Sequence, residues 1–100
     1  MRTVRAVRAR VPAESRAEYL ELLARWQAAC AESPRVKGFY VMESTETPGD
    51  FLEFLEFADE AAADAFGEEL REAPHRAILD RLRELVPDVL VETSFWRQRL

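Results

Sequence analysis

A single histidine, His75, is the first candidate for chemistry in this chain. It lies in the stretch REAPHRAIL, directly after Pro74, among residues that otherwise favour a helix. An imidazole titrates near neutral pH, so it can take a proton from a phenolic or quinol hydroxyl and generate an electron-rich anion that reacts directly with dioxygen. The alternative is an ordinary polar residue in the first turn of a helix, where imidazolium is disfavoured. The sequence leaves both interpretations open.

Two carboxylates, Glu53 and Glu56, occur in the apolar run FLEFLEF, residues 51–57. Successive residues of a strand point to opposite faces, so each face carries one of the two. Either carboxylate is a candidate general base if it is enclosed and its pKa is raised. The alternative is that each pairs with an arginine of the first strand across the sheet. A paired-carboxylate glycosidase is not supported, because the two groups lie on opposite faces.

The other chemical signals exclude several classes of protein. The only cysteine, Cys30, has no metal partners at ligand spacing and is expected to be a small core residue. No phosphate loop, nucleophile elbow or zinc motif occurs. A net charge of −5 argues against nucleic acid or an anionic membrane as a partner. With no disulfide, signal peptide or membrane span apparent, a cytoplasmic location is expected.

A chain of 100 residues, 48% of them hydrophobic, can bury one core, and residues 1–100 are expected to form a single domain. Asp59 is a predicted helix N-cap, and Ser15 with Glu18 has capping-box spacing. Pro74 is expected to break or restart the second helical segment. The predicted order is strand, helix, strand, strand, helix, strand, over residues 2–11, 13–32, 36–45, 51–57, 60–86 and 89–96.

This order predicts an α+β fold, the ferredoxin-like βαββαβ arrangement, with a four-stranded antiparallel sheet and two helices on one face. The other face of the sheet is then left without a cover. Apolar side chains occur on both faces of the strands, so we expect a second copy of the chain to cover the open face and form a homodimer.

The segments SPRVKGFYVMEST, TPGDFLEFLEF, ADEAAADAF and APHRAIL, with Pro12 before the first helix, resemble the dimeric α/β-barrel superfamily. Within it the chain is most similar to antibiotic-biosynthesis-monooxygenase-type (ABM) domains, which include cofactor-independent quinol and anthrone oxygenases and haem-degrading enzymes. The resemblance implies a monooxygenase-like homodimer that needs no cofactor and acts on a small aromatic molecule. The alternative is a non-catalytic homodimer that binds a small ligand or is associated with stress.

In this superfamily the small-molecule pocket lies between the sheet and its helices. His75, which resembles a family histidine that follows a proline, and Tyr40, whose hydroxyl needs a partner when buried, are the candidate catalytic residues. Aromatic residues at strand or helical spacing are also ordinary core residues, so a structural role stays open for each aromatic candidate. The candidates for substrate binding are Trp26, Phe57, Phe66 and Trp96.

Two departures from the family pattern bear on cofactor use. Relatives often carry tryptophan at the end of the third strand and histidine about nine residues later, where this chain has Phe57 and Phe66. The haem-degrading branch also uses asparagine, which this chain lacks altogether. Only His75 then remains as an axial ligand, so haem chemistry is disfavoured.

Overall fold

The computed structural model describes residues 1–100. Two short 3-10 turns, Ala13–Ser15 and Asp88–Leu90, precede the first helix and the last strand. The regular elements are β1 (Thr3–Arg10), α1 (Arg16–Ala31), β2 (Val36–Glu43), β3 (Asp50–Phe57), α2 (Glu60–Glu69), α3 (His75–Leu85) and β4 (Val91–Arg97).

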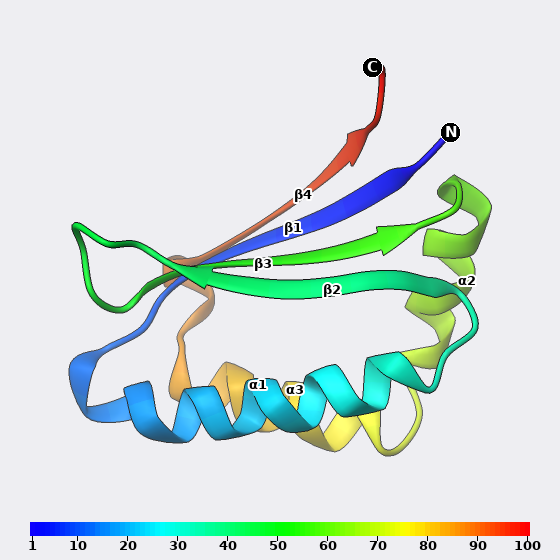
Figure 1. The fold of residues 1–100 in the computed structure, drawn as a ribbon. Helices are drawn as coiled ribbons and strands as arrows, with labels where there is room; N and C mark the ends of the chain where they lie inside the picture. The colour runs from blue at the N-terminus through cyan, green and yellow to red at the C-terminus, as the bar shows by residue number, and fades with distance from the viewer.

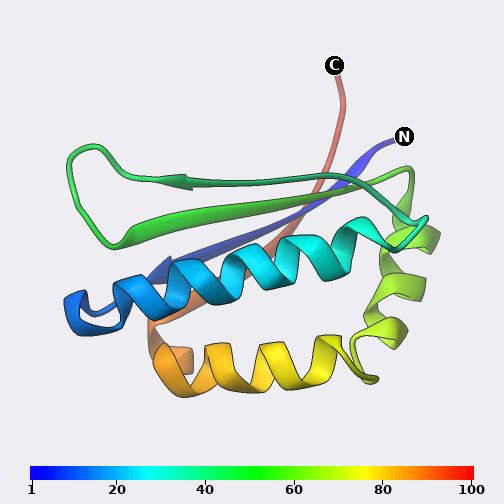
Figure 2. The same ribbon diagram turned by 60° about the horizontal axis from the view of Figure 1, so that its bottom comes forward.

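The four strands form one antiparallel sheet in the order β2-β3-β1-β4. The helices lie on one face of this sheet, and its other face is bare (Figure 1). Figure 2 shows α1 and α3 side by side beneath the sheet, with α2 at one end of the layer. The predicted ferredoxin-like α+β fold is therefore confirmed.

Strand register determines which side chains face the helices. In the β1–β3 ladder Val7 is opposite Glu53, and Ala9 is opposite Phe51. These residues share the helix-covered face, because residues directly opposite each other in a ladder project to the same side. Alternate residues, such as Glu56, project to the bare face.

The helix boundaries follow local signals in two of three cases. Asp59 caps α2, its Oδ1 accepting a hydrogen bond of 2.8 Å from the backbone N–H of Ala62. Pro74 separates α2 from α3, as predicted, so the second helical segment is two helices. The predicted capping box at Ser15 is wrong: its side chain makes no cap bond, because the 3-10 turn before α1 holds its backbone in helical geometry.

The core lies between the sheet and the helices. Its largest buried side chains come from α1, β3 and α2. None of the helices combines the length and the hydropathy that a membrane span requires. The largest fully buried side chains are Trp26, Phe51, Phe57, Phe66, Leu55 and Cys30.

Candidate functional site

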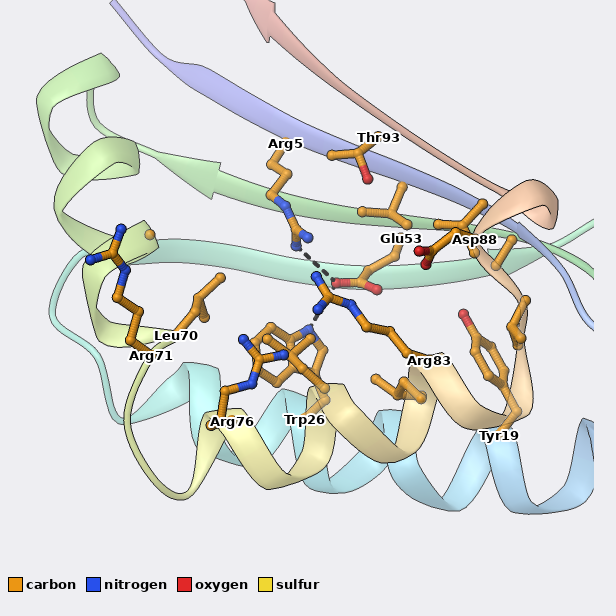
Figure 3. Close-up of a pocket in the computed structure, with 17 residues that line it drawn as sticks. Arg5, Tyr19, Trp26, Glu53, Leu70, Arg71, Arg76, Arg83, Asp88 and Thr93 are labelled. Carbon is orange, nitrogen blue, oxygen red and sulfur yellow. Dashed lines mark hydrogen bonds and ion pairs between the residues drawn. The ribbon is translucent and has the colours of Figure 1, made fainter.

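A pocket of about 540 Å³ opens between the sheet and the helices (Figure 3). Its volume is within the range of small-molecule sites, about 300 to 1,000 Å³. Strands β1, β3 and β4 form one wall, α1 and α3 form the opposite wall, and the end of α2 closes one side. The apolar part of the lining includes Val7, Tyr19, Trp26, Leu79, Leu82 and Val86.

Glu53 is the central polar group of this pocket. Its position in β3 directs it to the helix side, and it is only 6% exposed. The indole Nε1 of Trp26 donates a hydrogen bond of 2.9 Å to its Oε1. The guanidinium of Arg5 lies 3.8 Å from the same oxygen. Oε2 has no hydrogen-bond partner in the protein, so one carboxylate oxygen is fixed and the other is available to a ligand.

Burial raises the pKa of Glu53 above its ordinary value, because the charged form loses its hydration. Arg5 and the Trp26 hydrogen bond act in the opposite direction. A carboxylate with a raised pKa that remains able to ionise is a stronger base than an exposed one. Burial also raises the pKa of Tyr19, with Glu53 as a second cause, so that phenol stays protonated and can donate a hydrogen bond.

Trp26 connects Glu53 to the core. Its ring is 1% exposed and packs against Phe66 at a centroid distance of 6.4 Å. Phe66 in turn packs against Phe57 at 5.5 Å. Trp26 lines the pocket, whereas Phe57 and Phe66 are buried in the closed core and do not line it. The substrate-binding role expected for Phe57 and Phe66 stays a prediction.

His75 is half-buried at the start of α3, next to this aromatic layer. Its ring lies edge-on to Trp26 at 5.6 Å and to Phe66 at 5.8 Å. Its Nε2 is inaccessible to solvent and has no hydrogen-bond partner. His75 is not among the pocket-lining residues, so it contacts the site through the Trp26 ring. Its catalytic role stays a prediction.

Tyr40 and Trp96 lie on the bare face of the sheet, opposite the pocket. Tyr40 pairs with Phe54, stacks on its ring at 5.1 Å and is 44% exposed. Trp96 pairs with Val4 and is 63% exposed. Neither side chain lines the pocket with Trp26, because strand register directs both away from the helices, and the roles expected for them stay predictions.

The arginine-carboxylate pairing predicted across the sheet is confirmed on both faces. Arg5 lies near Glu53 on the helix side, and Nη1 of Arg2 lies 3.4 Å from Oε2 of Glu56 on the bare side. The phenol of Tyr40 also donates to Glu56, at 3.3 Å. The two predicted roles of Glu53, ion pairing and enclosure as a base, are therefore compatible.

Sequence reasoning missed the cationic part of the pocket, which includes Arg76 and Arg83 of α3. Their spacing from Leu79 and Leu82 places them beside the apolar stripe of the helix. This spacing is the feature of the sequence that could have indicated that they line the pocket. The pocket has no group of three or more metal-ligating side chains, and neither has the rest of the molecule.

The fold and the pocket define a small ferredoxin-like α+β domain with one carboxylate, that of Glu53, buried between sheet and helices. The family model for antibiotic biosynthesis monooxygenase matches residues 2–75. The chain belongs to this family. Comparison with the curated proteins finds no match.

Solved structures share this fold over nearly the whole chain. SnoaB, a cofactor-independent oxygenase from Streptomyces nogalater, is 18% identical with a TM-score of 0.83, covering 99% of this chain and 94% of its own. A conserved protein from Methanosarcina mazei is 20% identical with a TM-score of 0.83, covering 99% and 95%. Rv0793 from Mycobacterium tuberculosis is 14% identical with a TM-score of 0.82, covering 99% and 96%. These likenesses establish the fold.

Proposed function

We propose that this protein is a cofactor-independent monooxygenase that oxidises a small aromatic substrate of the quinol or anthrone type, with Glu53 as the general base. One observation carries the proposal: an enclosed carboxylate with a free oxygen faces a ligand-sized pocket. Membership of the antibiotic biosynthesis monooxygenase family and the likeness to a cofactor-independent oxygenase support it.

The reaction needs only dioxygen as the second reactant. Glu53 removes a proton from the acidic CH₂ of an anthrone, and the resulting anion supplies the electrons that a cofactor would otherwise supply. Transfer of electrons to dioxygen and formation of a C–O bond give a peroxide, which takes up a proton. Loss of water then breaks the O–O bond, so that R₂CH₂ and O₂ become R₂C=O and H₂O.

The residues around Glu53 assist this step in separate ways. Trp26 fixes one carboxylate oxygen, which leaves the other directed at the substrate. Arg5 favours the ionised form of the carboxylate and so lowers its pKa against the larger effect of burial. We assign His75 a positioning role, because its ring packs edge-on against the Trp26 indole and His75 does not itself line the pocket.

The test is dioxygen uptake by the purified, metal-free protein with a panel of naphthoquinols and anthrones, beside boiled protein. Glu53→Gln is expected to lower the rate about 10²- to 10⁴-fold, the usual contribution of a general base. Glu56→Gln is the matched control, since it makes the same change in the same strand on the opposite face. Equal rates for the two variants would contradict the role of Glu53.

The second candidate function is a non-catalytic, ligand-binding homodimer. The closed packing of Phe57 and Phe66 and the absence of His75 from the pocket lining favour it. It predicts binding of aromatic ligands without dioxygen uptake above the boiled control. The same panel therefore separates the two functions.

The homodimer itself is supported by the bare face of the sheet. Large apolar side chains are exposed there, which is costly for a monomer in water. Sedimentation is expected to give twice the mass of the chain, and a stable folded monomer at low micromolar concentration would contradict the dimer. The exposed residues are Tyr40, Met42, Leu52 and Trp96.

A further inference from the structure

Arginine dominates the charged groups of the pocket although the chain as a whole is acidic. Four arginines and two carboxylates line it, whereas the net charge of the chain is −5. A cationic pocket in an anionic protein attracts anions locally and not over the whole surface. The arrangement of these arginines indicates which of them are available to a ligand.

Two of the four, Arg5 and Arg71, lie outside α3, and each pairs with a carboxylate of the chain. Arg5 is the ion partner of Glu53 on the sheet side. Arg71, at the end of α2, lies 3.3 Å from the carboxylate of Glu68, and both side chains are exposed. The charge of each of these two guanidiniums is therefore partly offset by a carboxylate of the chain.

The other two, Arg76 and Arg83, extend from α3 towards the sheet (Figure 3). Nε of Arg76 donates a hydrogen bond of 2.9 Å to Asp80. Its Nη2 lies 2.9 Å from the same oxygen but outside hydrogen-bond geometry, and it is inaccessible to solvent. Arg83 makes no hydrogen bond and no ion pair with any residue of the chain.

The position of these two arginines along α3 is regular. They are seven residues apart, two turns of helix, and therefore lie on the same side. Leu79 and Leu82 lie between them and line the pocket. Arg81, on another side of the helix, has its donors occupied by two carboxylates at 2.7 to 2.8 Å. The arginine with satisfied donors thus lies on another side of the helix, whereas Arg83, which has no partner in the chain, lines the pocket.

We propose that the pocket selects aromatic substrates that carry a carboxylate, held by Arg83 and Arg76 while the aromatic ring lies between Trp26 and the leucines of α3. A guanidinium binds a carboxylate through two parallel hydrogen bonds, which fixes both position and orientation. The inference rests on the proposed function, since the anchored ring directs its acidic hydroxyl or CH₂ group at Glu53. Arg5 offsets the charge of Glu53, so the bound carboxylate meets a net positive lining.

The test is anaerobic binding of two probes that differ only in the carboxylate, 1-hydroxy-2-naphthoate and 1-naphthol, followed by calorimetry. The wild-type protein is expected to bind the acid at least about tenfold more tightly, and this preference is expected to shrink with added salt. Arg83→Gln and Arg76→Gln are each expected to weaken binding of the acid about tenfold and to leave 1-naphthol unchanged. Arg25→Gln, which removes the same charge from the exposed side of α1, is the matched control and is expected to change neither affinity.

Equal affinity for the two probes would overturn the inference, as would an equal effect of Arg83→Gln and Arg25→Gln on the acid. No binding of the acid up to about 1 mM would also overturn it. Circular dichroism of each variant establishes that it is folded before its affinity is compared. Binding under nitrogen is independent of turnover, so selective binding without dioxygen uptake would contradict the proposed function alone.

Discussion

The hydrogen bond from Trp26 to Glu53 is the interaction whose removal is most informative. Trp26→Phe keeps an aromatic ring against Phe66 and His75 but removes the Nε1 donor, which lies 2.9 Å from Oε1 of Glu53. The donor stabilises the ionised carboxylate more than the protonated one, so its loss is expected to raise the pKa of Glu53 further.

The magnitude follows from the strength of such a bond. A hydrogen bond to a charged group contributes about 1.5 to 3 kcal/mol, and one pKa unit corresponds to about 1.4 kcal/mol. The pKa of Glu53 is therefore expected to rise by about one to two units in Trp26→Phe. Because the pKa of Glu53 is higher in the folded than in the unfolded chain, the free energy of unfolding falls as pH rises from the unfolded-state pKa to the folded-state pKa. The variant extends this window to higher pH, so its loss of stability is greatest at neutral pH and shrinks in acid.

The assay is a carbon-13 NMR titration of the glutamate side-chain carboxyls, with Glu53 assigned from Glu53→Gln. Trp96→Phe is the matched control, because its indole donates to the hydroxyl of Ser94 at 2.8 Å on the exposed face. Its effect on the pKa of Glu53 is expected to be nil, and on stability within about 0.5 kcal/mol. The same Glu53 pKa in Trp26→Phe and in the wild type would refute the reasoning.

Three further predictions concern stability. Glu53→Gln removes the buried carboxyl group, so its free energy of unfolding in urea is expected to rise relative to that of the wild type as pH increases above about 4.5. A difference in unfolding free energy that does not change with pH would be inconsistent with a raised pKa of Glu53. Arg16 and the backbone N–H of Gly49 hold the pKa of Glu43 at about 2. The ionised Glu43 therefore stabilises the fold fully above its ordinary pKa of 4.5, and this stabilisation is lost as pH falls towards 2. Glu43→Gln is therefore expected to lose less stability than the wild type over that acid range, and equal acid sensitivity would argue against the pairing. Phe66→Ala is expected to cost about 3 to 5 kcal/mol in thermal unfolding, and a cost under about 1 kcal/mol would show that the core closes over the gap.

The sequence was sufficient for the features that local rules control. Alternation along β3 correctly separated Glu53 from Glu56, because the period of a strand is fixed by its backbone. The Asp59 cap and the break at Pro74 were also correct, since both depend on neighbouring residues alone. Ser15 failed as a cap because a 3-10 turn, which the sequence does not distinguish from a helix start, precedes α1.

The candidate site was predicted less completely because it depends on register between strands. Alternation tells which residues of one strand share a face, but not which face the helices cover. The sequence therefore did not reveal that Tyr40 and Trp96 lie on the face opposite the pocket. Arg83 was missed for a related reason: an arginine on a helix next to leucines is also typical of a solvated surface, and only the placement of α3 against the sheet brings it to a pocket.

The claim that Glu53 takes a proton from the bound substrate is tested most directly by mixing the protein with an anthrone under nitrogen and recording the absorption of the anthrone anion. The wild type and Glu56→Gln are expected to convert the bound anthrone to its anion, and Glu53→Gln is expected to bind it without doing so. Formation of the anion to the same extent by Glu53→Gln would contradict the assignment of Glu53 as the base.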